Sequence, residues 1–181
     1  WYQKAADQGF ARAQFNLGVM YANGEGVLKD DKQAVKWFRK AADQGLADAQ
    51  HNLGFMYENG RGVLKDDKQA VKWYQKAADQ GDADAQYNLG GMYANGEGVL
   101  KDDKQAVKWY RKAADQGHTS AQYNLGLMYD KGKGALKDYK QAVKWYQKAA
   151  DQGYAGAQLN LGVMYANGEG VLKDDKQAVK W

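Results

Sequence analysis

The 181-residue sequence contains no cysteine, no proline and only two histidines. Without cysteine the chain forms no disulfide and offers no thiolate to a metal ion. The histidines, His51 and His118, occupy different positions of the repeat described below, so they do not form a metal-binding pair by symmetry. We therefore expect no metal and no cofactor.

Long hydrophobic runs are also absent. No segment approaches the roughly 18 apolar residues that span a bilayer, and the first residues do not form a basic-then-apolar leader. The chain begins at Trp1 rather than at methionine, so we expect that the first residue of the gene product is not in view. The cytoplasm, the bacterial periplasm and secretion all stay open as locations.

The charges nearly cancel. Lysine and arginine number 26 against 22 acidic residues, which gives a net charge of +4 and a pI near 9.0. This excess permits an acidic partner but is too small over such a length to indicate one. Hydrophobic residues make up 44% of the chain, enough to bury a continuous core.

A repeat organises what is present. The stretch NGEGVLKDDKQAVKW occurs at 23–37, 95–109 and 167–181, and a strict period of 36 residues accounts for all the tryptophans. They are Trp1, Trp37, Trp73, Trp109, Trp145 and Trp181. Such a period predicts a stacked array in which each repeat buries its apolar face against its neighbours. We expect one domain over 1–181, with five periods cut mid-repeat at both ends, and therefore a fragment of a longer protein.

Each repeat holds two helical patterns. Apolar Ala13, Leu17 and Tyr21 share one face of a helix predicted over 11–23, which ends at Gly24. Asp30, followed three residues later by glutamine, has the spacing of a capping box and predicts the start of a second helix that ends near residue 45. The short connection predicts antiparallel helix pairs, and hence an all-α fold.

The pattern AxAQxNLGxMYxNGxGVLKDxKQAVKWYxKAADQG resembles the consensus of the Sel-one-like repeat family, relatives of tetratricopeptide repeats in bacteria and eukaryotes. The resemblance covers essentially the whole chain. It implies a right-handed superhelical solenoid of antiparallel helix pairs, whose concave surface serves as an adaptor for other proteins. Two departures stand out. Relatives that bind or hydrolyse β-lactams are rich in cysteines, which this chain lacks, and Leu28 and its equivalents stand where proline is common.

Variation among the repeats collects on one face of the first helix. The variable positions are three or four residues apart and fall within an arc of about 80°, whereas the opposite face hardly changes. We call this face the variable stripe and predict that it binds the partner. Its candidate contact residues are Arg12, Phe15, Val19, Asp48, His51, Phe55, Glu58, Asp84, Tyr87, Gly91, Tyr123, Leu127, Asp130 and Leu159. Tolerated surface substitution after duplication is the alternative explanation.

Invariant asparagines border the stripe, with Asn52, Asn88 and Asn124 as weaker candidates. Such an amide can bind a ligand backbone or, as an alternative, a neighbouring helix or loop. The repeated lysines of the second helix, such as Lys32 and Lys36, are explained by a solvated outer surface without any partner.

No arrangement of catalytic residues is apparent. The paired carboxylates of Asp30 and Asp31 stand at a helix start, where they act as caps, and the turn glycines do not follow a strand as in a phosphate-binding loop. We therefore predict a non-enzymatic scaffold that binds a protein or peptide. RNA binding by a helical repeat array, and weak binding of β-lactams or cell-wall ligands, are the alternatives. The two ends of the chain could also stack head to tail between molecules.

Overall fold

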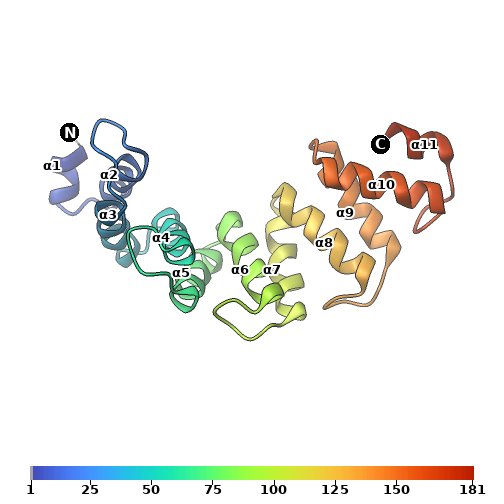
Figure 1. Cartoon of the computed structure of the whole chain (residues 1–181), viewed down its shortest axis with the longest axis horizontal. Helices are drawn as coiled ribbons and strands as arrows, with labels where there is room; N and C mark the ends of the chain where they lie inside the picture. The colour runs from blue at the N-terminus through green and yellow to red at the C-terminus, as the bar shows by residue number, and fades with distance from the viewer. Residues whose placement is uncertain (1) are drawn as a thin grey trace. The chain divides into compact units, whose positions relative to one another are not determined.

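The structure is a computed structural model that describes residues 2–181. These residues form eleven α-helices and no strand, which confirms the all-α prediction (Figure 1). The helices are α1 (Tyr2–Asp7), α2 (Ala11–Asn23), α3 (Asp31–Asp43), α4 (Ala47–Asn59), α5 (Asp67–Asp79), α6 (Ala83–Asn95), α7 (Asp103–Asp115), α8 (Thr119–Lys131), α9 (Tyr139–Asp151), α10 (Ala155–Asn167) and α11 (Asp175–Lys180). The chain divides into two compact units. The first holds the described residues up to Met92 and Gly96–Leu100, and the second holds Tyr93–Asn95 and Lys101–Trp181. The expectation of one domain stays a prediction.

The helix boundaries follow from local chemistry. Helix α2 ends at Gly24, whose φ of 78° lets its N–H donate to the Met20 carbonyl at 2.8 Å. Helix α3 begins after Asp30, whose carboxylate accepts the backbone N–H groups of Lys32 and Gln33 at 2.9 and 3.0 Å. These bonds satisfy two of the N–H groups that a helix start leaves without partners. The predicted helix over 11–23 and the predicted cap at Asp30 are confirmed, but the Asp30 N–H donates to the Tyr21 carbonyl at 2.9 Å rather than to Gln33 as a full capping box requires.

Consecutive helices pack in pairs within each unit, for example α2 on α3, α4 on α5 and α8 on α9. The second helix of each repeat supplies most of the buried apolar surface, as Ala70, Trp73 and Tyr74 do from α5. The tryptophans at 37, 73, 109 and 145 are only 4–5% exposed. A lysine one turn further on covers each ring, with its Nζ 4.2–4.6 Å from the ring centroid. Trp1 lies outside the described residues.

A helical glycine brings the two helices of a repeat close together. A Cβ built on Gly54 would lie 2.8 Å from the ring of Tyr74, and one on Gly126 would lie 2.6 Å from the ring of Tyr146. The aromatic ring of the second helix therefore fills the space that the glycine leaves. This packing places the ring directly beneath the first helix.

Buried glutamines tie successive repeats. The Gln50 side chain donates to the Ala42 carbonyl at 3.1 Å and accepts from Gln80 Nε2 at 2.7 Å. Gln14 and Gln122 form the same pair of bonds with their own neighbours. Because a buried amide is costly unless its partners are present, this arrangement fixes the spacing of three helices.

Turn glycines provide a second connection between repeats. Gly62 has a φ of 69°, and a Cβ on it would lie 2.2 Å from the backbone oxygen of Asp31 in the preceding repeat. Gly134 stands in the same relation to Asp103, where the distance would be 2.0 Å. Both the positive φ and the close approach require glycine at this position.

Candidate functional site

The variable stripe reaches solvent in every repeat. Four of its residues are exposed: Arg12, Phe55, Asp84 and Leu159. Phe55 and Leu159 are 40% and 68% exposed. The other members are half-buried, namely Phe15, Val19, Asp48, His51, Glu58, Tyr87, Gly91, Tyr123, Leu127 and Asp130. None is buried, so every member has some surface available to a ligand.

Neighbouring first helices touch through stripe residues. Arg12 of α2 forms an exposed ion pair with Asp48 of α4. His51 of α4 lies 3.1 Å from Asn88 of α6, measured from ring Nε2 to amide Nδ2. Asn88, predicted to bind either a ligand or a neighbour, is thus seen to bond a neighbour. The stripe forms a connected surface within the first compact unit.

The stripe aromatics also pack downward onto the second helix. The ring centroids of Phe15 and Phe38 are 5.9 Å apart, those of Tyr123 and Tyr146 are also 5.9 Å apart, and that of Tyr123 lies 4.7 Å from that of Tyr154. Pairs at these separations are favourable beyond the area they bury. The stripe aromatics therefore contribute to stability as well as to the surface.

The acidic position of the stripe meets the hydroxyl of the buried tyrosine in the second repeat. Tyr74, fully buried in α5, donates its hydroxyl to Glu58 Oε2 at 2.5 Å. Burial raises the pKa of Tyr74 above its ordinary value, and the bond to Glu58 raises it further. The hydroxyl is therefore a permanent donor, and the Glu58 carboxylate is held against the protein.

In the fourth repeat, Tyr146 occupies the position of Tyr74, but its hydroxyl lacks a carboxylate partner. Tyr146 is 1% exposed, yet its hydroxyl has no hydrogen-bond partner. Burial raises the pKa of Tyr146, and the charge of Asp130 raises it further, whereas the nearby Asn160 amide acts in the opposite direction. Asp130 instead accepts from Lys131 Nζ at 2.9 Å.

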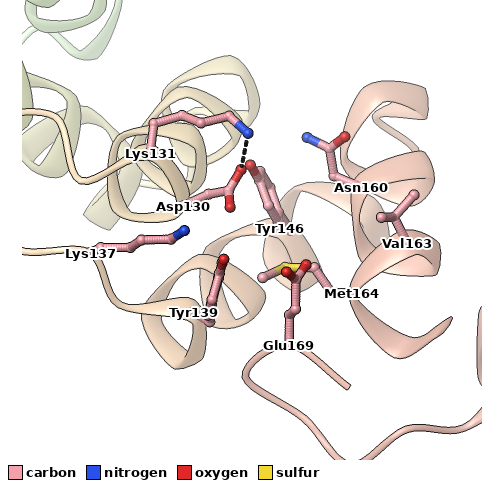
Figure 2. A pocket seen from close by; sticks show the side chains of 9 residues that line it. All are labelled: Asp130, Lys131, Lys137, Tyr139, Tyr146, Asn160, Val163, Met164 and Glu169. Atoms are coloured by element: carbon pink, nitrogen blue, oxygen red, sulfur yellow. Dashed lines mark ion pairs between the residues drawn. The ribbon is translucent and has the colours of Figure 1, made fainter. Parts of the chain in front are cut away.

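A hollow of about 300 Å³ opens beside this tyrosine. It is lined by Asp130, Lys131, Lys137, Tyr139, Tyr146, Asn160, Val163, Met164 and Glu169, and we call it the Tyr146 pocket. Figure 2 shows the polar ends of Lys137, Tyr139 and Glu169 turned toward the same space. The volume is at the lower end of the range for small-ligand sites.

A second, smaller hollow lies on the stripe in the first unit. Its volume is about 160 Å³. The residues that line it include Val19, Phe38, Asn52, Phe55 and Arg61. Two predicted contact residues and one predicted edge asparagine thus come together around a single depression. Nothing further distinguishes the edge residue Asn124, which is half-buried.

The sequence interpretation did not select most residues of the Tyr146 pocket. Of its lining only Asp130 was among the predicted contacts, although Val163 and Asn160 occupy the repeat positions of Phe55 and Asn52. A signal was present at the end of α8 and the start of α9, where Lys131 replaces an asparagine and Tyr139 replaces an aspartate of the other repeats.

The sequence and the helix packing identify the family. The Sel1 repeat model matches residues 1–10, 11–46, 47–82, 83–118, 119–154 and 155–181. The chain belongs to the Sel1 repeat family. Sel1 repeat proteins are generally scaffolds for protein interaction, and the family is typically non-enzymatic. No curated protein sequence matches the chain.

Solved structures of Sel1 repeat proteins are closely similar. The crystal structure of c5321, a protective antigen with an SLR fold present in uropathogenic Escherichia coli strains, is 44% identical with a TM-score of 0.97 over 98% of this chain. A Sel1 repeat protein from Oxalobacter formigenes is 42% identical with a TM-score of 0.90, over 96% of this chain and 69% of its own. Cysteine-rich protein B of Helicobacter pylori is 28% identical with a TM-score of 0.57, over 71% of this chain and 92% of its own. This Sel1 repeat chain spans 38% of the length of c5321.

The described part of the Sel1 repeat chain holds neither a cluster of metal-ligand side chains nor a membrane-spanning helix. Over residues 2–181, no group of three histidine or acidic side chains comes together in a way that could hold a metal ion. Within the same range, no helix is both long enough and apolar enough to pass through a bilayer.

Proposed function

We propose that this Sel1 repeat protein is a non-enzymatic scaffold whose variable stripe binds a protein or peptide partner. The observation that carries the proposal is the exposure of large apolar stripe residues beside a hollow, with Phe55 40% exposed at the rim of the depression in the first unit. Exposed aromatic surface next to a depression is typical of residues that dominate binding energy. The general role of Sel1 repeats agrees with this function.

The burial of each stripe residue decides whether it is suitable for a mutational test. Tyr87 and Tyr123 are attractive anchors by residue type, but Tyr123 packs against Tyr146 and Tyr154, so removing it would also loosen the fold. Phe55 offers a cleaner variant because it is more exposed than either tyrosine. Loss of binding in a Phe55 variant can therefore be assigned to the surface rather than to unfolding.

The test compares Phe55→Ser with Leu64→Ser. Both variants remove one exposed apolar side chain from the first unit, but Leu64, which is 91% exposed, lies in the turn rather than on the stripe. A partner is isolated by affinity capture, purified, and titrated against each variant. We expect Phe55→Ser to weaken binding about fivefold or more and Leu64→Ser to leave it unchanged. The reverse pattern would assign binding to the turn leucines and refute the stripe.

The other predicted interactions have no observation in their favour. RNA binding and binding of β-lactams or cell-wall ligands remain alternatives. Head-to-tail stacking of the two ends also stays a prediction, which sedimentation velocity over a range of concentrations would test.

A further inference from the structure

The fourth repeat differs from the others in the charge of one segment. Its segment 130–140 carries four lysines and two aspartates, whereas each of the four equivalent segments has at least as many acidic as basic residues. The substitutions include Asp130, Lys131, Lys133 and Tyr139, and three of these four line the Tyr146 pocket. These changes in charge lie around one hollow and distinguish it from the equivalent places in the other repeats.

The equivalent site in the second repeat shows which hydrogen bond the Tyr146 pocket lacks. In the second repeat the Tyr74 hydroxyl donates to the carboxylate of Glu58. In the fourth repeat the acidic residue is Asp130, one methylene shorter, and its carboxylate is paired with Lys131 instead. The Tyr146 hydroxyl is left buried without a partner. A buried hydroxyl with no partner is destabilising, so a ligand that accepts its hydrogen bond removes a cost already present in the free protein.

The hydrogen-bond donors that line the pocket favour a carboxylate as that acceptor. Lys131 and Lys137 both line the pocket, and their ammonium groups accompany the hydroxyls of Tyr139 and Tyr146. The carboxylates of Asp130, which pairs with Lys131, and of Glu169 from the next repeat balance the two lysine charges, so the donor groups rather than a net positive charge favour this ligand. Hydrogen bonds from ammonium and hydroxyl groups to a carboxylate are among the stronger ones in proteins.

We propose that the Tyr146 pocket binds a glutamate side chain of an acidic peptide, whose carboxylate accepts from Tyr146 and the two lysines as Glu58 accepts from Tyr74. This inference deepens the proposed scaffold function and rests on it, because the peptide belongs to the bound partner. It adds the chemistry of one contact, at a position on the chain separate from the Phe55 depression.

The pocket can be tested without a known partner. The probe is N-acetyl-L-glutamate methylamide, titrated into the full chain while the backbone amide signals of the unique segment 130–140 are followed by NMR. We expect saturable shifts with this probe, and binding at least about fivefold weaker with the neutral glutamine analogue. The lysine analogue should give no saturable shift. Absence of saturable shifts with the glutamate probe, or equal binding of all three, would overturn the proposal.

Variants distinguish the pocket from the surface in general. Tyr146→Phe should weaken the glutamate probe about fivefold, while Tyr74→Phe, at the closed equivalent site, should leave its affinity unchanged. Asp130→Glu should weaken the probe as well, because a longer side chain can reach Tyr146 as Glu58 reaches Tyr74. Tighter or unchanged probe binding by Asp130→Glu would contradict this geometry.

The outcome is separable from that of the scaffold function. A partner that depends on Phe55 while the glutamate probe does not bind would refute the pocket and leave the scaffold intact. A probe that binds at the pocket while Phe55→Ser has no effect on the partner would refute the stripe as the main contact.

Discussion

Tyr74 and Tyr146 occupy the same repeat position and are buried to the same degree, but their hydroxyl groups have different surroundings. The Tyr74 hydroxyl donates to Glu58, whereas the Tyr146 hydroxyl has no partner. A hydrogen bond to a charged group stabilises a protein by more than a neutral one does, and an unpaired buried hydroxyl is destabilising. The same substitution should therefore have different effects at the two positions.

We expect Tyr74→Phe to lower the free energy of unfolding by about 1–2 kcal/mol, because it leaves the half-buried Glu58 carboxylate without its donor. Tyr146→Phe should be neutral or stabilising, since it removes a hydroxyl that has no partner. Urea denaturation followed by circular dichroism measures both. Equal destabilisation by the two substitutions would show that the Tyr146 hydroxyl is bonded in solution.

At the scale of elements, the turn before α5 is attached to α3 by an ion pair between Arg61 and Asp31. Arg61 Nη2 lies 2.7 Å from Asp31 Oδ1, and its Nε lies 3.2 Å from Oδ2, so the contact is bidentate. The hydrogen bond from Arg61 is the main cause that lowers the pKa of Asp31 below its ordinary value. Glu25 and Glu97 occupy the position of Arg61 in the repeats on either side.

This contact should make part of the stability depend on pH. Because the pKa of Asp31 is lowered in the folded state, the ion pair contributes above the unfolded pKa of about 4 and is lost as the pH falls through the folded value. Arg61→Ala should therefore cost about 0.5–1 kcal/mol at pH 7, a range typical of partly exposed pairs. The difference from the parent should shrink below about pH 4. Lys68→Ala, at an exposed cation on α5, provides the control for loss of a positive charge. A difference that stays constant down to pH 2 would refute the ion pair.

Which elements the sequence could predict depends on the range of the interactions involved. The helix over 11–23 and the cap at Asp30 were predictable because apolar spacing, Gly24 and the capping aspartate act within a few residues. The packing of Phe15 on Phe38, or of Gly54 on Tyr74, joins residues twenty or more positions apart and depends on how the helices cross. Repetition still indicated that these positions face the interior.

The candidate site was predictable only in part. Internal comparison of the repeats located the stripe, and the structure places none of its members in the core. The Tyr146 pocket arises from one methylene of difference between Asp130 and Glu58, and from the turn of that carboxylate toward Lys131. Side-chain direction of this kind cannot be read from a pattern of residue types. The unusual lysines of 130–140 would have drawn attention to the segment, but not to the unpaired hydroxyl.

At the scale of the whole molecule, the distribution of charge bears on which class of partner the chain takes. The net charge is +4, but the stripe places Asp48, Glu58, Asp84 and Asp130 against a single arginine. A surface that tracks a nucleic-acid backbone requires a basic face instead. The many lysines of the second helices stand over the buried tryptophans rather than among the stripe residues.

We therefore expect no binding of single-stranded RNA in the micromolar range at physiological salt. Fluorescence anisotropy with a labelled oligoribonucleotide, repeated over a series of salt concentrations, tests this. Arg12→Ala is the matched variant, because Arg12 is the only arginine or lysine among the stripe residues. Binding that weakens steeply with salt and is lost in Arg12→Ala would favour the RNA alternative over a protein partner.

The close approach of Gly62 to the Asp31 backbone, and of Gly134 to Asp103, bears on how such a gene can change in length. The glycine of each turn packs against a backbone carbonyl at the start of the helix one repeat earlier. An insertion or deletion shorter than a repeat would replace that glycine by a residue whose side chain collides with the carbonyl. Gain or loss of 36 residues at a time restores the fit at every junction. Recombination between near-identical copies also adds or removes whole repeats, so alleles of this gene should differ by whole numbers of repeats.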